Sequence, residues 1–464
     1  MIDTHCHLEM EQFNEDRDAV IARARAAGVE ILITIGSDIE GCEGAVELSR
    51  KLDFVYAAVG VHPHDAKDFS DEVAGMIRSW VAESRGYDAA CMEVNPPKIV
   101  AIGEIGLDYY YDHSPRHLQR EGFARQLDIA KELDLPVVVH SRDAVEDTMC
   151  ILEASGVRKG IMHCFSGDLD MARRAMELGL HISFAGTVTF KKAVSLKEVA
   201  AMVPDEFLLI ETDAPYLAPV PMRGKRNEPA FIVHTAKHIA ELRGITLQDI
   251  DRITTLNAKR LFGIGNSGEA QIAYRIRDSL YLNITNRCTN KCSFCIRYQS
   301  DFVKGHNLRL HGEPTAKELQ DAIGDPRSYR EVVFCGYGEP MLRLDVVKSV
   351  AAWIKEQGGV VRINTNGQGN VINGKNVLPE LKGIVDALSV SLDAPDEETY
   401  DRVCRPTFKG VFDEVVGFLR EAKTYIPDVQ ATVVEMEGVD VDRCRRLADE
   451  LGVKLRVRKL DVVG

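Results

Sequence analysis

The chain has 464 residues, 45% of them hydrophobic, so we expect more than one domain with a full core. It has no run of eighteen apolar residues, no signal peptide in its first residues and scattered cysteines, which predicts a cytoplasmic protein without membrane partners. The net charge is −14, and residues 1–267 carry 42 acidic against 29 basic side chains, which argues against broad wrapping of nucleic acid.

Short apolar runs alternate with amphipathic segments, such as residues 16–27 and 121–133, up to residue 263. The predicted strands are residues 2–5, 31–36, 56–61, 99–105, 136–141, 160–164, 181–184 and 208–212. Eight strands alternating with helices over about 250 residues predict an α/β fold, a (β/α)8 TIM barrel covering residues 1–263. A doubly wound open sheet is the alternative.

Metal-binding side chains lie at or near the ends of these strands. They are His5, His7, Glu104, His140, His163 and Asp213. Barrel enzymes place catalytic groups where the C-terminal strand ends converge. Six such groups could hold two divalent ions (zinc, magnesium or manganese), with a carboxylate such as Glu104 bridging, and two ions can activate water for phosphoryl displacement. Asp213 could take a proton from that water. A single histidine could be a core or loop residue, but all six together favour a metal centre.

Several short motifs carry a family resemblance. They are residues 3–8, 60–64, 103–108, 140–142, 163–167 and 211–217. In this order they resemble the TatD family of metal-dependent deoxyribonucleases over roughly residues 1–263. The resemblance implies the same six metal ligands and hydrolysis of DNA phosphodiesters, often from the 3′ end, with DNA or a nucleotide as substrate. His62 and the basic loop from Arg223 to Arg226 are candidates for holding phosphate, although the loop could be a solvated turn.

The composition of residues 261–268, with its Gly, Asn and Ser, predicts a helix end followed by a linker, assigned to residues 264–279. Helical segments then include residues 345–357 and 411–424. The predicted strands of the second half are residues 280–285, 332–335, 361–364, 387–392, 430–434 and 454–458. Six such units predict a partial (β/α)6 barrel over residues 280–464, whose open side admits substrate.

Three cysteines follow the first of these strands: Cys288, Cys292 and Cys295. Thiolates select iron–sulfur clusters, zinc or copper(I), and a cubane cluster normally takes four of them, so three leave one iron open. A zinc knuckle completed by a distant ligand and three unrelated cysteines are the alternatives, but the usual zinc spacings are absent. With Phe294 as the aromatic residue before the third cysteine, the run is similar to that of radical SAM enzymes.

This second resemblance implies a [4Fe–4S] cluster on the three cysteines and reductive cleavage of S-adenosylmethionine (SAM) to a 5′-deoxyadenosyl radical. An electron donor such as flavodoxin or ferredoxin would be a partner. The resemblance also points to residues that contact SAM, with Ser391 and Asp393 able to hydrogen-bond a ribose. The candidates are Phe294, Gly336, Gly338, Glu339, Asn364, Ser391 and Asp393.

The sequence therefore predicts a bifunctional enzyme, a TatD-type hydrolase joined to a radical SAM domain. Such a fusion is similar to the proteins described as TatD-nuclease-associated radical SAM enzymes. Two alternatives stay open: the barrel hydrolyses another phosphoester, an ester or an amide, since barrels do not dictate substrate, or one half only binds and delivers substrate to the other.

Overall fold

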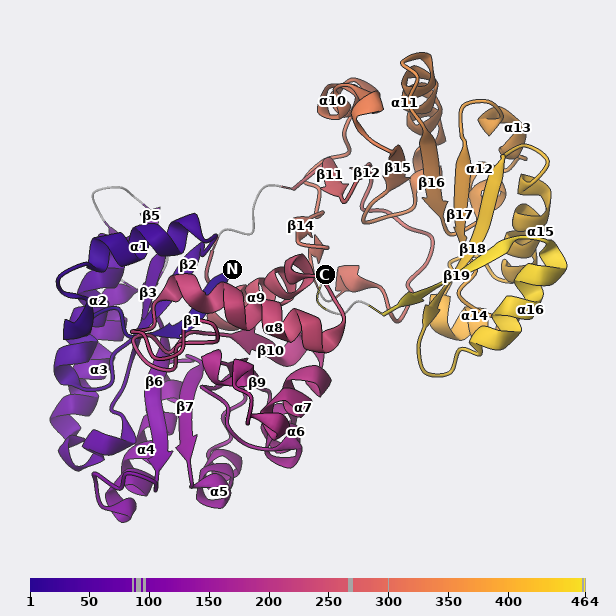
Figure 1. Cartoon of the computed structure of the whole chain (residues 1–464). Coiled ribbons are helices and arrows are strands. Elements are labelled where there is room, and N and C mark those ends of the chain that lie inside the picture. The colour runs from indigo at the N-terminus through magenta and orange to yellow at the C-terminus, as the bar shows by residue number, and fades with distance from the viewer. Residues whose placement is uncertain are drawn as a thin grey trace. The chain divides into compact units, whose positions relative to one another are not determined.

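The computed structural model describes residues 1–85, 87–88, 93–94, 97–265, 270–298, 300–460 and 463. Contacts divide the chain into two compact units, Met1–Asn266 and Ser267–Gly464, shown in Figure 1. The linker predicted for residues 264–279 spans this division, and its residues 266–269 lie outside the described residues. Among the described residues, no helix combines the length and the apolarity needed to cross a lipid bilayer.

Eight parallel strands form the large sheet of the first unit, in the order of the chain. A parallel bridge between Cys6 and Ala214 joins the end of the first strand to the segment after the last, so the sheet curves into a barrel. The predicted (β/α)8 barrel is confirmed, and the open doubly wound sheet is wrong. The strands are β1 (Ile2–Cys6), β2 (Ile31–Ile35), β3 (Val55–Val59), β6 (Ile99–Asp108), β7 (Val137–Arg142), β8 (Gly160–Met162), β9 (Leu180–Phe184) and β10 (Leu208–Ile210).

Helices surround this sheet (Figure 1). They are α1 (Arg17–Ala26), α2 (Ile39–Lys51), α3 (Asp71–Ser84), α4 (Arg116–Glu132), α5 (Val145–Ser155), α6 (Leu169–Glu177), α7 (Val194–Met202), α8 (Ile232–Arg243) and α9 (Leu247–Phe262). The ends of α9 follow from its sequence, because Thr246 and Asp249 form a capping box and Gly263 adopts the left-handed conformation (φ 64°). A small hairpin pairs β4 (Tyr87–Asp88) with β5 (Glu93–Val94).

Strand β6 continues past the predicted end at residue 105, so Glu104 lies inside the strand and not at its end. The pairing register of β6 with β7 shifts around Glu104, and such irregularities re-aim side chains. Gly103 has a φ of 157°, and a Cβ at this position would lie 2.5 Å from the Cβ of Val138. Only glycine therefore permits the close approach of the two strands beside Glu104.

The second unit contains a seven-stranded sheet. Its strands are β11 (Ala273–Ile276), β12 (Ser279–Asn283), β15 (Glu331–Cys335), β16 (Val361–Thr365), β17 (Ala387–Ser391), β18 (Asp428–Glu435) and β19 (Lys454–Lys459). Six of them, from β12 to β19, pair in parallel, as the predicted partial barrel requires. The seventh, β11, pairs antiparallel with β12 and lies within the predicted linker, which is therefore shorter than expected.

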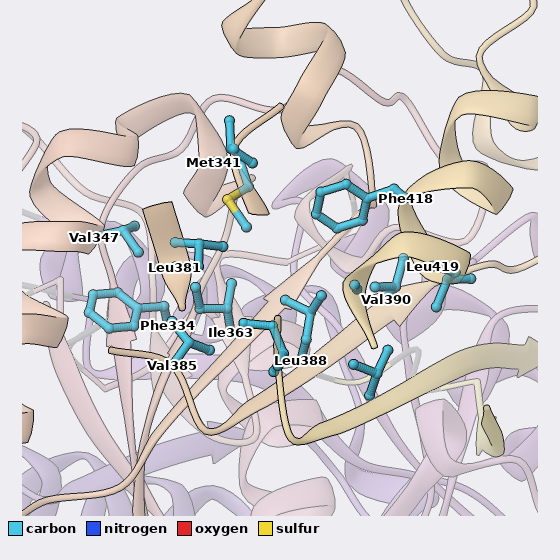
Figure 2. Close-up of a cluster of buried hydrophobic side chains, with 14 of the residues drawn as sticks. Phe334, Met341, Val347, Ile363, Leu381, Val385, Leu388, Val390, Phe418 and Leu419 are labelled. Carbon is cyan, nitrogen blue, oxygen red and sulfur yellow. The ribbon is translucent and has the colours of Figure 1, made fainter. Parts of the chain in front are cut away.

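Helices pack on the apolar face of this sheet. They are α10 (Ala316–Ile323), α11 (Leu344–Glu356), α12 (Gly369–Asn373), α13 (Leu378–Leu381), α14 (Glu397–Cys404), α15 (Phe412–Ala422) and α16 (Val441–Leu451). Figure 2 shows Phe334 and Leu388 from two strands in the cluster that Phe418 of α15 joins. The opposite face carries several polar residues, since side chains alternate along a strand. Arg362 lies there and pairs with Glu331 at 2.9 Å.

Phe334→Ala should lower the free energy of unfolding of the second unit by about 3–5 kcal/mol, because removing a fully buried ring leaves a cavity. Trp80 in α3 and Trp353 in α11 give each unit its own fluorescent reporter. In urea titrations of single-tryptophan variants, only the Trp353 transition should move to lower urea. Val360→Ala, at a side chain that is 41% exposed, should move neither transition. Equal shifts of both transitions in Phe334→Ala would contradict separate cores.

Candidate metal centre and cluster loop

The six predicted metal ligands converge at one end of the barrel, because the C-terminal ends of its parallel strands meet there. His5 and His7 come from β1 and the residue after it, Glu104 from β6, His140 from β7, and His163 and Asp213 from the segments after β8 and β10. Five of them are buried and His140 is half-buried. Together with His62 and Cys164, their ligand atoms form four groups of three within 4.8 Å, which are His5, Glu104 and His163; His5, His7 and Asp213; His62, Glu104 and His140; and His163, Cys164 and Asp213.

The carboxylate of Glu104 faces two sets of imidazoles, one with each oxygen. Its Oε2 lies 3.4 Å from His5 Nε2 and 3.8 Å from His7 Nε2. Its Oε1 lies 2.9 Å from His140 Nδ1 and 3.3 Å from His163 Nε2. A carboxylate with this arrangement can be shared by two cations.

The first donor set fits a divalent ion. The Nε2 atoms of His5 and His7 lie 3.2 Å apart, and Asp213 Oδ1 lies 3.6 and 3.5 Å from them. His7 Nδ1 lies 2.8 Å from the carbonyl oxygen of Ile35 and donates to it, so Nε2 is the nitrogen that faces Asp213 and would face a cation. A cation between these three atoms satisfies all of them. Imidazole and carboxylate donors suit zinc and manganese, and carboxylate also suits magnesium.

Further carboxylates orient the ligands of the second set. Asp108 Oδ2 lies 3.2 Å from His140 Nε2 and 3.0 Å from His64 Nε2. Glu211 Oε1 lies 2.8 Å from His163 Nδ1. The contacts to His140 and His163 turn the other ring nitrogen of each toward Glu104, the arrangement common around metal-ligating histidines. Asp108 and Glu211 were not predicted as site residues, although both lie inside motifs that carried the resemblance.

The two carboxylates among the predicted metal ligands, Glu104 and Asp213, are charged at neutral pH. Burial by itself raises the pKa of Glu104, but the imidazoles of His163 and His62 outweigh it and hold this pKa well below its usual range. Burial also opposes ionisation of Asp213, and the hydrogen bond from His7 lowers its pKa. Burial lowers the pKa of His62 to about 4, so this ring is neutral. Buried negative charge of this kind favours a bound cation.

A cavity of about 630 Å³ opens over the ligands. His62, a predicted phosphate contact, lines it. Arg223 and Arg226, predicted for the same task, are not among the described residues that line the cavity. The guanidinium of Arg226 instead pairs with Asp16 at 2.8 Å. Arg142, which was not predicted as a site residue, does line the cavity.

In the second unit, the loop after β12 carries the three predicted cluster ligands, Cys288, Cys292 and Cys295. All three are free and partly exposed thiols. The backbone N–H groups of Lys291 and Ser293 donate to carbonyls at the end of α14, at 3.1 and 2.8 Å. The guanidinium of Arg297 donates to the carbonyl of Asn290 at 2.6 Å. These bonds fix the loop through its backbone, and the backbone N–H of Asn290 also donates to Cys288 Sγ at 3.4 Å.

The glycine turn after β15 packs against this loop. A Cβ on Gly338 would collide with the carbonyl oxygen of Arg287, and the next backbone N–H, that of Glu339, donates to the same oxygen at 2.8 Å. The buried carboxylate of Glu339 accepts hydrogen bonds from Thr365 Oγ1 at 2.8 Å and Asn366 N at 2.7 Å. Glu339, a predicted SAM contact, therefore ties the turn to the end of β16.

The remaining predicted SAM contacts also gather at the C-terminal ends of the strands. Gly336, with φ 115°, follows β15, Asn364 lies in β16, and Ser391 ends β17. Asp393 is buried, which raises its pKa, and Phe294 packs partly against the core. Asn364 Oδ1 is buried and has no hydrogen-bond partner in the described part of the chain. A buried polar atom in this position needs a partner from a ligand or water.

Comparison with known proteins assigns a family to each unit. Residues 2–263 match the family described as TatD related DNase, and residues 282–451 match the Radical SAM superfamily. Both families consist of enzymes.

Several relatives of the first unit are similar over nearly their whole length. The metal-dependent hydrolase YabD of Bacillus subtilis is 45% identical over 266 residues, which are 57% of this chain and 99% of that protein. The 3′-5′ ssDNA/RNA exonuclease TatD of Cronobacter sakazakii is 35% identical over 56% of this chain and 97% of its own length. The crystal structure of YJJV, a TatD homolog from Escherichia coli K12, has a TM-score of 0.53 and 32% identity over 57% of this chain and 98% of that one. The chain therefore belongs to the TatD family of metal-dependent hydrolases through its first unit, and it carries a radical SAM domain in its second.

Proposed function

We propose that the first unit is a two-metal-ion phosphodiesterase that releases nucleotides from single-stranded DNA. The observation that carries this proposal is the position of Glu104 between two donor sets, each facing one carboxylate oxygen. Two ions about 3.5–4 Å apart suit an in-line displacement at phosphorus. The description of the Cronobacter sakazakii relative as a 3′-5′ ssDNA/RNA exonuclease supports this substrate.

The ligands divide between the two ions. His5, His7 and Asp213 would hold one, His140 and His163 would hold the other, and Glu104 would be shared, since its Oε2 faces the first set and its Oε1 the second. When bound, the ions supply Lewis acidity, which lowers the pKa of water and neutralises charge on the phosphate. The ionised carboxylate of Asp213 accepts the proton of the attacking water. His62 Nδ1 accepts a hydrogen bond from the backbone N–H of His64, so its Nε2 carries the proton. This Nε2 lies 3.5 Å from Glu104 Oε1 and would donate to a phosphate oxygen once substrate is bound.

Glu104→Gln should slow nucleotide release from a single-stranded oligonucleotide by more than about 100-fold, because even loss of an outer partner of a metal ligand costs roughly 10–100-fold. The measurement is the rate with Mg²⁺, Mn²⁺ or Zn²⁺. Glu206→Gln, at an exposed carboxylate of the same unit, is the matched control and should match wild type. Equal rates for Glu104→Gln and wild type would refute the centre. If the wild type does not cleave DNA but hydrolyses a small phosphoester, ester or amide, the result would favour the alternative hydrolase over the phosphodiesterase.

For the second unit we infer a [4Fe–4S] cluster on Cys288, Cys292 and Cys295. The three sulfurs are not among the groups of described ligand atoms that lie within 4.8 Å of one another. A tetrahedral zinc ion with bonds of about 2.3 Å would hold them about 3.8 Å apart. A cluster accepts a wider spacing, because each thiolate binds a different iron atom.

We further infer that SAM binds beside this cluster. The cluster supplies the electron that cleaves SAM to the 5′-deoxyadenosyl radical, and flavodoxin or ferredoxin would deliver that electron. The orphaned Asn364 Oδ1 would accept a hydrogen bond from the cofactor. Ser391 and Asp393, which can hydrogen-bond a ribose, would hold its sugar. The remaining contacts are the turn backbone at Gly336, Gly338 and Glu339, and the ring of Phe294.

Anaerobic reconstitution should load about four irons per chain. Cys292→Ser should abolish the brown absorbance and the iron content, because two thiolates cannot hold the cluster. Cys150→Ser removes an exposed thiol of the first unit and should leave the iron content unchanged. Nucleotide release should persist in both variants, since the two units have separate cores. Binding of one zinc ion in place of iron would contradict the cluster.

A further inference from the structure

Two exposed tyrosines stand at the mouth of the cavity that holds the metal ligands. Tyr111 is 50% exposed and Tyr216 is 47% exposed, and both line the cavity. The backbone N–H of Tyr216 donates to the carbonyl of Asp213, and its ring centroid lies 6.2 Å from that of His7. Exposed aromatic rings at a cavity mouth are typical of binding surfaces, because a ligand that covers them gains the free energy of burying their apolar area.

The ring of Tyr111 is held in place from several sides. Its backbone N–H donates to Asp108 Oδ1 at 2.9 Å. The ring of His113 lies parallel to it, with centroids 5.5 Å and planes 5° apart, and the ring of His64 meets it edge-on at 5.5 Å. A ring fixed in this way loses little conformational freedom when a ligand stacks on it.

Arg142 adds a positive charge beside this ring. It lies two residues after His140 in β7 and therefore on the same face of the strand. Its guanidinium carbon lies 4.7 Å from the ring centroid of Tyr111 and 4.0 Å from that of Tyr110. In the part of the chain that the structure describes, this guanidinium has no carboxylate or hydrogen-bond partner, whereas that of Arg226 is paired. A cation of this kind awaits an anion from the ligand.

We propose that these three residues, Tyr111, Arg142 and Tyr216, form a rim that binds the nucleotides next to the scissile phosphodiester. Arg142 holds a neighbouring phosphate, for which a planar guanidinium is well suited, and the tyrosine rings stack on unpaired bases. In a duplex, the neighbouring base pairs cover the faces of each base, so the tyrosine rings can stack only on bases of a single strand. The rim therefore selects single strands. This inference rests on the phosphodiesterase proposed above and deepens it by naming what the site recognises.

The test compares a single-stranded oligothymidylate with an abasic strand of equal length, which has the same phosphodiesters but no bases. The full chain with Mn²⁺ should prefer the base-bearing strand in kcat/KM by about 5- to 150-fold, the effect of one stacked base. Tyr111→Ala and Tyr216→Ala should each lower kcat/KM for the base-bearing strand and bring this ratio toward one. Tyr111→Phe keeps the ring and should keep the ratio. Tyr298→Ala, at an exposed tyrosine of the second unit, is the matched control.

Arg142→Gln should raise KM for both strands and make KM depend less steeply on salt, because one phosphate contact is lost. Arg142→Lys keeps the charge and should retain part of the salt dependence. A salt dependence in Arg142→Gln equal to that of wild type would remove Arg142 from the rim.

The outcomes separate this inference from the function on which it rests. A ratio near one in wild type, or equal losses on both strands in the tyrosine variants, would overturn the rim and leave the phosphodiesterase standing. If wild type cleaves neither strand, the proposed phosphodiesterase activity is refuted. Binding of the two labelled strands, measured by fluorescence anisotropy, then tests the rim. Tighter binding of the base-bearing strand that Tyr111→Ala abolishes would support it, and equal binding would overturn it.

Discussion

An ionised carboxylate enclosed by imidazoles is the interaction on which the first unit depends. Glu104 is only 4% exposed, and a buried charge of this kind costs several kcal/mol unless its surroundings compensate. The compensating rings belong to other strands or to the residues just after them, so the charge is tolerated only where the strand ends meet. Closure of the barrel between Cys6 and Ala214 is therefore required by the site as well as by the core. The inward-facing donor atoms that result are also what a pair of cations needs.

The strands of both barrels could be predicted because their apolar runs are short, are bounded by turn residues and recur between amphipathic helices. Strand β11 could not be predicted in this way. Ala273–Ile276 has four residues and pairs on one side only, with β12. Its stability comes from contacts between residues apart in the chain, such as the stacking of Tyr274 on Tyr281, whose centroids lie 5.6 Å apart. The pattern of apolar and polar residues within 273–276 does not reveal these distant contacts.

The metal ligands could be proposed from residue type and place, because histidines and carboxylates are uncommon at the ends of apolar strands. The supporting contacts could not, since they depend on how rings turn in the folded chain, as with Asp108 and Glu211. Arg226 was predicted to hold phosphate only because it is a positively charged residue in a basic loop. Its partner Asp16 lies 210 residues away in the sequence and takes up that charge. The availability of Arg142 is likewise a property of the folded chain.

Asp108 belongs to two sites at once. Its Oδ2 lies 3.2 Å from His140 Nε2, and its Oδ1 accepts the backbone N–H groups of Tyr110 and Tyr111. An ion bound to His140 would therefore also restrain the turn that presents Tyr111. Thermodynamic linkage would make such an effect reciprocal: a strand that ordered the turn on binding would raise the affinity for the ion by the same factor. The barrel would then hold its second ion most firmly while occupied and exchange it more readily between turnovers.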